Sequence, residues 1–183
     1  MNSLDAEMIA GWSDGVADAL NSRRAIISVN CPSHLVEKLR LLFGRLGNTR
    51  ILLSHLGMPG AMRSARKKLQ PVLGLAALPH VGVKLSGVYA CNDHPHPGLC
   101  ELLEDLLRAY GGSRLYWGSD FSPALDVVTF AQTLMAYRAL SRRVPAEVFA
   151  RNLQDVIRRV RSPGVPAFGT GRRKGLDSTK NPQ

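Results

Sequence analysis

Four short apolar runs, each followed by a segment with helical spacing, most constrain how this chain can fold. The runs are of strand length and lie at residues 25–29 (AIISV), 50–54 (RILLS), 81–85 (VGVKL) and 114–117 (RLYW). Their nearly continuous apolar character is typical of strands buried on both faces, as in a parallel sheet that helices cover. The alternation therefore predicts an α/β protein built from right-handed βαβ units.

The intervening segments carry apolar residues at the spacing of a helix. In residues 34–46 four leucines and Phe43 form one stripe, and Ser33 ahead of them is the predicted N-cap. Further helices are predicted at residues 4–20, 62–78, 99–110, 127–140 and 145–160. This order fits either an open doubly wound sheet or part of a (β/α)8 barrel. Because a complete barrel has eight strands in about 250 residues, four parallel strands correspond to half of one.

Composition separates a folded body from a different carboxy-terminal end. Hydrophobic residues make up 45% of the 183 residues, which suits one ordinary domain. From Ser162 onward the chain is rich in Gly, Pro, Ser and Thr and poor in apolar residues. We therefore predict a half-barrel domain at residues 1–160 and a flexible basic tail at residues 161–183. Much of the net charge of +10 belongs to this end, since seven basic residues and one acidic residue lie at 158–183.

Cysteine usage and hydropathy indicate the compartment. Three cysteines are an odd number and too few for a disulfide framework in a chain of this length, which favours a reducing environment. No apolar run approaches the roughly 18–20 residues of a membrane span, and the first residues are acidic where a signal peptide would be basic. We expect a cytoplasmic protein without membrane contact.

Candidate site residues follow from where the predicted strands end, because ligands bind at the carboxyl ends of parallel strands. His55 follows the second strand and Asp120 the fourth, while Lys84 and Ser86 close the third and Asn30 the first. An imidazole can bind a divalent metal or hold a carbonyl, and a carboxylate can take a proton from water or bind the metal. A loop histidine bonded to backbone and an N-cap aspartate are the structural alternatives for His55 and Asp120.

These runs together resemble a known family. The succession ISVNCP, RILLSHLGMPG, VKLSGVY and WGSDFSP, followed by VFARNLQDVI, is similar to the amidohydrolase-related family of TIM-barrel hydrolases. Within it, the lactonase branch that includes 2-pyrone-4,6-dicarboxylate and sugar-acid lactonases is the most similar. The resemblance covers about residues 25–157 and makes the four strands the last four of the barrel. It implies hydrolysis of a small carboxylated or sugar-derived lactone, and Asn152 resembles the family's structural asparagine.

The resemblance also implies roles for the residues at the strand ends. Asp120 would be the catalytic residue that activates water, and His55 would bind a metal or polarise the substrate carbonyl. With one divalent ion such as zinc, His55 and Asp120 would be its ligands, although the branch is also compatible with metal-independent catalysis. Lys84 and Ser86 fall in the seventh-strand motif and, with Asn30, are the predicted substrate contacts.

One family feature is missing from its expected place. The family's site is completed by a His-x-His pair in the first strand, whereas the only such pair here, His94-Pro95-His96, follows the third predicted strand. We therefore expect the chain alone to be an inactive or incomplete hydrolase. The second interpretation is a non-catalytic truncated remnant, or a complementing subunit of a split barrel. The expected partners are a small-molecule substrate and either a second copy or a missing half-barrel.

Two other binding functions receive less support from the sequence. Four potential zinc ligands occur within ten residues, at Cys91, His94, His96 and Cys100, but their spacing matches no common zinc motif. A loop that shapes specificity is the alternative. The basic tail lacks the interleaved aromatic residues of nucleic-acid modules, so no nucleic-acid partner is expected. The basic residues within 63–68 are interpreted as a solvated helix face.

Overall fold

The centre of the molecule is a four-stranded parallel sheet. The computed structural model describes residues 14–91, 96–121, 126, 128–138 and 144–161. The strands are β1 (Ile26–Val29), β2 (Arg50–Leu53), β3 (Val81–Leu85) and β4 (Leu115–Trp117), in the spatial order β1-β2-β3-β4. Every neighbouring pair is parallel, so β1 and β4 are the edges of the described sheet. The predicted α/β class with four parallel strands is confirmed.

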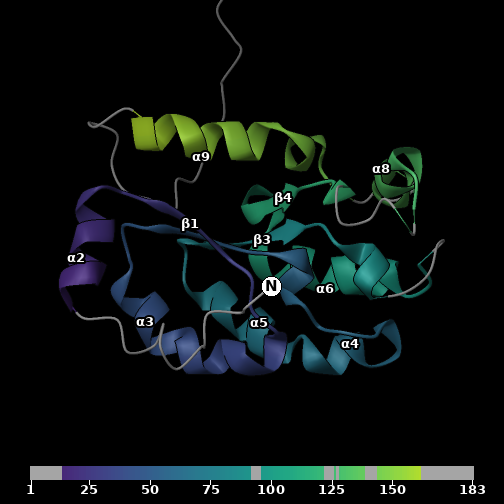
Figure 1. Ribbon diagram of the computed structural model, residues 1–183, viewed down its shortest axis with the longest axis horizontal. Coiled ribbons are helices and arrows are strands. Elements are labelled where there is room, and N and C mark those ends of the chain that lie inside the picture. Colours follow the sequence, from purple (N-terminus) through teal and green to yellow (C-terminus); the bar gives the residue numbers. More distant parts are fainter. Residues whose placement is uncertain (1–13, 92–95, 122–125, 127, 139–143, 162–183) are drawn as a thin grey trace, which may run out of the picture.

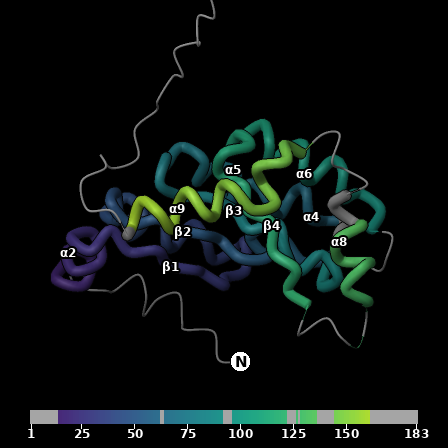
Figure 2. Tube along the Cα trace, turned by 90° about the horizontal axis from the view of Figure 1, so that it is seen from above, coloured from purple at the N-terminus to yellow at the C-terminus, as the bar shows by residue number. Residues whose placement is uncertain are grey.

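Helices lie on both faces of this sheet. The described α-helices are α2 (Asp14–Ser22), α3 (Arg40–Arg45), α4 (Met62–Lys68), α5 (Gln70–Gly74), α6 (Leu99–Tyr110), α8 (Phe130–Arg138) and α9 (Arg151–Arg161). The 3-10 helices are η1 (Ser33–Leu39), η2 (His55–Gly57), η3 (Leu75–Ala77), η4 (Val88–Ala90), η5 (Gly112–Arg114) and η6 (Ala146–Phe149). Figure 1 shows α3, α4 and α5 below the sheet and α9 above it, and Figure 2 shows α9 lying across the strands.

Three predicted helices are divided in the structure. The helix predicted at 145–160 is the 3-10 helix η6 followed by α9, and Pro145 is the N-cap of η6 rather than its first helical residue. Residues 34–46 form the 3-10 helix η1 followed by the short α3, and Pro32 rather than Ser33 is the N-cap, with no side-chain capping bond. Ser33 is buried, and Pro32 supplies the extended backbone that precedes a helix. The predicted helix at 62–78 divides at Leu69, because the ring and missing N–H of Pro71 fit only the first turn of a new helix.

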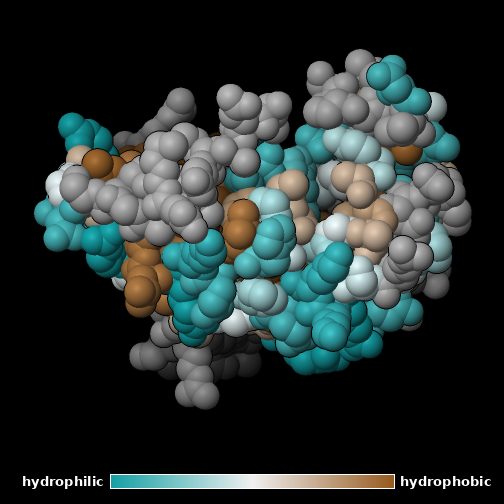
Figure 3. Space-filling view, turned by 60° about the horizontal axis from the view of Figure 1, so that its bottom comes forward, coloured by the Kyte–Doolittle hydropathy of each residue, from teal (hydrophilic) through white to brown (hydrophobic). Residues whose placement is uncertain are grey.

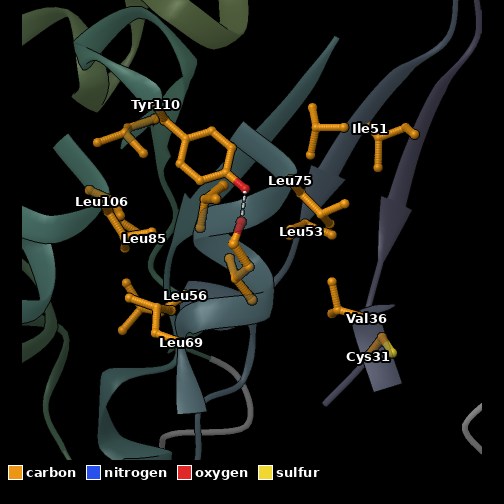
Figure 4. Close-up of a cluster of buried hydrophobic side chains, with 14 of the residues drawn as sticks. Cys31, Val36, Ile51, Leu53, Leu56, Leu69, Leu75, Leu85, Leu106 and Tyr110 are labelled. Carbon is orange, nitrogen blue, oxygen red and sulfur yellow. Dashed lines mark hydrogen bonds between the residues drawn. The ribbon is translucent and has the colours of Figure 1, made fainter. Parts of the chain in front are cut away.

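The larger core lies between the sheet and the helices below it. Alternate strand residues, including Ile51, Leu53 and Leu85, point into this layer because successive side chains of a strand face opposite ways. Figure 4 shows the side chains of this core from the strands and the helices. The buried hydroxyl of Tyr110 donates to the carbonyl of Val72, so the one polar atom of this ring is satisfied.

The other face of the sheet is covered by α9. Val156 of this helix is buried against Leu52 and Tyr116, and Ile26 and Leu153 pack beside them. In a closed barrel, the strand face that points away from the surrounding helices forms the interior. Helix α9 therefore occupies the face that would be the inner face of a complete barrel, and we call this surface the inner face.

Asn152 fixes the start of α9 to the sheet. Its side-chain amide donates to the backbone carbonyls of Gly112, at 2.8 Å, and Leu115, at 3.0 Å. The residue is 9% exposed, so both carbonyls would lose their partner in a dry environment if the amide were removed. The contacts agree with the structural role that the family resemblance implies for Asn152.

One ion pair joins the basic helix α4 to α6. Arg66 Nε lies 2.6 Å from Asp105 Oδ2, and Arg108 contacts the same carboxylate at 3.1 Å. The hydrogen bond from Arg66 lowers the pKa of Asp105. Arg66 is nevertheless 65% exposed, and Lys67 and Lys68 are exposed as well, so the described part of this basic face is solvated as predicted.

The surface view agrees with a globular body. Figure 3 shows extensive hydrophilic regions around several separate hydrophobic patches. Within the described ranges, no helix combines the length and the apolar character needed to cross a bilayer. Residues 4–13 of the helix predicted at 4–20 and the tail from 162 onward lie outside these ranges, so these predictions stay predictions.

We predict that Asn152→Leu lowers the free energy of unfolding by about 1–3 kcal/mol, because two buried carbonyls lose their donor. Urea denaturation of the full chain measures the change. Gln154→Leu, at an exposed position of the same helix, is the matched control and should change stability far less. Equal effects of the two substitutions would contradict the anchoring role of Asn152.

Candidate active site

The turn after β2 places His55 at the carboxyl edge of the sheet. His55, Leu56 and Met58 have φ values of 52°, 58° and 49°, and Gly57 has 76°. Consecutive left-handed residues are costly for side chains other than glycine and occur mainly where the surrounding structure holds them. Here Leu56 is fully buried, and a Cβ on Gly57 would lie 2.5 Å from a methyl carbon of Val72. Packing of the turn therefore determines where the imidazole lies.

Ser86 joins this turn to the end of β3. The backbone N–H of His55 donates to Ser86 Oγ at 3.3 Å, and the ring Nδ1 lies 3.1 Å from the same oxygen. Gly87 follows with a φ of 65°, and a Cβ there would lie 2.6 Å from Nδ1. Only a glycine lets the backbone pass this close to the imidazole without displacing it.

Asp120, which follows β4, completes the cluster. Its Oδ2 lies 3.3 Å from His55 Nδ1 and accepts a hydrogen bond from the hydroxyl of Tyr89 at 2.7 Å. The His55 and Asp120 side chains are 25% and 19% exposed, so both are shielded and still reachable. Asp120 also has a left-handed φ of 48°. The loops of β2, β3 and β4 thus bring His55, Ser86 and Asp120 together, as the strand order predicts.

The other two predicted contacts lie farther from this centre. Lys84 reaches across the inner face and donates to Ser28 Oγ at 2.7 Å, and Ser28 Oγ lies 3.2 Å from Ser54 Oγ. Asn30 is exposed and makes no hydrogen bond within the described part of the chain. The structure therefore places Lys84 in a polar group beside the site and leaves Asn30 at its margin.

Sequence analysis missed Tyr89. The residue ends the run VKLSGVY, and the turn of Gly87 followed by η4 directs its hydroxyl to Asp120. A tyrosine shortly after a strand end is a weak signal by itself, because its direction depends on the left-handed glycine before it. The aspartate is therefore held by a residue that only the folded chain identifies.

Burial controls the charges of this cluster. It lowers the pKa of His55, with a smaller lowering from the charge of Lys84 and an opposing rise from Asp120. It also lowers the pKa of Lys84, again against the charge of Asp120. Burial, with the hydrogen bond to Asp120, raises the pKa of Tyr89 to about 12. Near neutral pH the imidazole of His55 is therefore uncharged, and the hydroxyl of Tyr89 keeps its proton and donates a hydrogen bond.

The described donors do not by themselves fit a zinc ion. Zinc sites in proteins use at least three side-chain ligands, and no group of three His, Cys, Asp or Glu residues lies together among the described residues. His55 and Asp120 supply two donors, and Nδ1 already contacts Ser86 and Asp120. His94 of the alternative zinc motif lies outside the described ranges. We therefore derive no chemical step through a metal.

The carboxyl edge of the parallel sheet thus carries a histidine and an aspartate in contact with each other. The family model described as amidohydrolase matches residues 4–155, so the chain belongs to the amidohydrolase family. No curated protein matches the chain. The family match confirms the resemblance noted in the sequence.

Solved structures share the fold. An amidohydrolase from Burkholderia multivorans with bound zinc has a TM-score of 0.68 at 20% identity, over 82% of this chain and 56% of that one. A Pseudomonas putida protein, described as a candidate 2-pyrone-4,6-dicarboxylic acid hydrolase, has a TM-score of 0.60 at 21% identity. The match covers 87% of this chain and 58% of the Pseudomonas protein. This chain thus spans less than two thirds of these relatives, and its sheet corresponds to part of their barrel.

We predict that His55 in the folded chain titrates below its ordinary pKa of about 6.5. Because folding disfavours the protonated ring, this group's contribution to stability is present above that value and is lost as the pH falls below it. Asp120→Asn should lower the pKa of His55 further, because a negative charge beside the ring is removed. Lys84→Met should raise this pKa, because a positive charge is removed. An NMR titration of the ring protons measures all three, and shifts of the same sign in both variants would contradict the electrostatic argument.

We also predict that Gly87→Ala displaces the imidazole of His55, because the added Cβ has no room beside Nδ1. Gly60→Ala is the matched control, since Gly60 has a φ of 74° and its nearest neighbour is the end of the Lys68 side chain at 3.8 Å. Both variants should lose about 1–2 kcal/mol of unfolding free energy to backbone strain. Only Gly87→Ala should lose more unfolding free energy than this and shift the NMR signals of the His55 ring protons. Unchanged ring signals in Gly87→Ala would refute the close approach of Gly87 to the imidazole.

Proposed function

We propose that the chain hydrolyses the ring ester of a small lactone, with Asp120 as the general base that takes a proton from water. One observation carries the proposal: the Asp120 carboxylate is held by Tyr89 at 2.7 Å and lies 3.3 Å from His55, at the carboxyl edge of a parallel sheet. Solved relatives described as candidate pyrone dicarboxylic acid hydrolases support the choice of an ester in a ring.

The two oxygens of Asp120 have different surroundings. Oδ2 accepts the Tyr89 hydroxyl and lies beside the His55 ring, whereas Oδ1 has no hydrogen-bond partner within the described residues. We assign Oδ1 the proton of the attacking water, and Asp120 then returns this proton to the ring oxygen of the ester as its bond to the carbonyl carbon breaks. A base must be oriented as well as basic, and the bond to Tyr89 supplies that orientation.

His55 has the complementary task at the carbonyl. Its lowered pKa keeps the ring neutral, so it can donate to the carbonyl oxygen only from the tautomer that carries the proton on Nε2. Ser86 permits this tautomer, because its hydroxyl can donate to Nδ1 across 3.1 Å. The hydrogen bond from Nε2–H would then stabilise the negative charge that develops when water attacks.

Lys84 and Asn30 remain the proposed substrate contacts, whereas Ser86, also predicted as one, positions the imidazole of His55. Lys84 is the cation of this region, partly buried on the inner face, with its ammonium 2.7 Å from Ser28. Ser86 is nearly buried and already serves His55, so its part is to position the ring. Asn30 is exposed at the end of β1 and can contact only a substrate that reaches that edge.

A specific observation favours a second candidate function, that of a complementing half-barrel. Both β1 and β4 are edges of the described sheet, and an edge offers unpaired N–H and C=O groups to another strand. Solved relatives are longer than this chain. A second copy or a separate half-barrel could pair with these edges and supply further groups to the site.

We predict that Asp120→Asn lowers kcat for lactone hydrolysis by at least about 100-fold, the usual value of a general base. Ring opening of 2-pyrone-4,6-dicarboxylate and of D-glucono-1,5-lactone can be followed with the full chain, and circular dichroism monitors folding. Asp126→Asn, at an exposed aspartate near the site in sequence, is the matched control and should retain activity.

A loss much smaller than this would remove Asp120 from the role of general base. A folded chain that hydrolyses neither lactone would refute the proposal for this chain alone and favour the complementing half-barrel.

A further inference from the structure

The inner face of the sheet changes from apolar to polar toward the carboxyl edge. Ile26 and Leu52 pack with α9 on this face. Ser28 and Ser54 follow them by two positions, so their side chains leave the strands on the same side. Lys84 points to this face as well, because its neighbours in β3 belong to the core below the sheet. Ser28, Ser54 and Lys84 form a polar group that we call the lysine–serine cluster.

The amine of Lys84 contacts a hydroxyl rather than a carboxylate. Its Nζ donates to Ser28 Oγ at 2.7 Å, and Ser28 Oγ lies 3.2 Å from Ser54 Oγ. Among the described residues, no carboxylate forms an ion pair with Lys84. A carboxylate would favour the charged form of the amine, whereas a hydroxyl can accept from an ammonium group or donate to a neutral amine. The cluster therefore accommodates both protonation states of Lys84.

Partial burial distinguishes Lys84 from the other described lysines. Those lysines are exposed, and they are Lys38, Lys67 and Lys68. Lys84 is partly buried, while its partner Ser28 is open to solvent. Burial lowers the pKa of Lys84, and the charge of Asp120 opposes this effect. A lysine that gives up its proton more readily carries a nucleophilic lone pair more often, so Lys84 is the described lysine best suited to covalent chemistry with a small molecule.

We propose that Lys84 binds small aldehydes covalently, as an imine of its amine. The neutral amine attacks the carbonyl carbon, a C–N bond forms, and the electron pair of the C=O double bond moves to the oxygen. One N–H proton passes to that oxygen. The resulting hydroxyl then leaves with the second N–H proton as water, and the nitrogen lone pair completes the C=N bond. The reaction uses no oxidant or reductant, and addition of water reverses it.

The lysine–serine cluster suits this chemistry in two ways. Ser28 Oγ is 2.7 Å from Nζ, so it can take an N–H proton while its own proton passes to the carbonyl oxygen. An aldehyde carbon carries a hydrogen and needs less room beside a partly buried amine than a ketone carbon does. The site is independent of the proposed lactone hydrolysis, because neither Asp120 nor His55 takes part in imine formation.

Reductive trapping in the full chain tests the proposal. Acetaldehyde with sodium cyanoborohydride converts each lysine imine into a stable N-ethyl lysine, and mass spectrometry of the peptides locates the label. At limiting acetaldehyde and neutral pH, we expect the lysine label to lie mainly on Lys84 rather than on Lys67 or Lys68, although the latter two are more exposed. A label that lies mainly on the exposed lysines would overturn the inference.

Two substitutions locate the reaction. Lys84→Arg keeps a cation on the inner face but removes the amine, so the chain should lose most of its lysine label. Lys67→Arg, at an exposed lysine of α4, is the matched control and should keep that label. Retention of the label by folded Lys84→Arg would overturn the inference. If Lys84→Arg does not fold, the distribution of label among the peptides of the unsubstituted chain decides the question.

Unfolding separates activation by the fold from an effect of the local sequence. In guanidinium chloride the burial of Lys84 is lost, so the ratio of its label to that of Lys67 should fall from the value in the native chain. An equal ratio in the native and the unfolded chain would also overturn the inference. Because the label is measured without turnover, these results do not depend on whether the chain hydrolyses a lactone.

Discussion

The parallel, in-register pairing of β2, β3 and β4 is the constraint on which the site depends. Parallel pairing brings the ends of the three strands to one edge, so the residues that follow them meet although they lie 31 to 65 positions apart in the chain. Ser86 shows how fine this requirement is. Its single oxygen contacts both the backbone and the ring of His55 on the neighbouring strand. A shift of one residue would turn Ser86 to the other face, because side chains alternate along a strand.

Strain is concentrated at this same edge. Five of the six described non-glycine residues with a positive φ lie in the loops after β2, β3 and β4, and they include His55, His96 and Asp120. Each such conformation costs of order 1–3 kcal/mol. Burial of Leu56, the hydrogen bond from His55 to Ser86 and the hydrogen bond from Tyr89 to Asp120 offset part of that cost. The core below the sheet therefore stabilises a backbone that would not adopt these angles by itself, and the side chains at the edge are held in place.

Predictions from the sequence agree with the structure where one physical effect dominates. The apolar runs at β2 and β3 located those strands well, because burial on both faces leaves little room for polar residues. The predictions from the sequence were incomplete where the local structure depended on a second, competing effect. Pro71 divides a continuous apolar stripe into α4 and α5, and Asp105 of α6 pairs with the exposed Arg66 of α4, a contact that the spacing of the basic residues does not predict. Tyr89 could not have been found, since its direction depends on Gly87 and on an aspartate 31 positions away.

Helix α9 opposes closure of this sheet into a complete barrel. The interior of an eight-stranded barrel has space for side chains but not for a helix. Strands added beyond β1, whether fused to the chain or supplied by another molecule, must therefore compete with α9 for Leu52 and Tyr116. Barrel closure therefore requires Val156 to leave its contacts with Leu52 and Tyr116, so that the side chains of the incoming strands can replace it there. The stability of the open sheet and the ease of closing it are then opposing properties of a single helix.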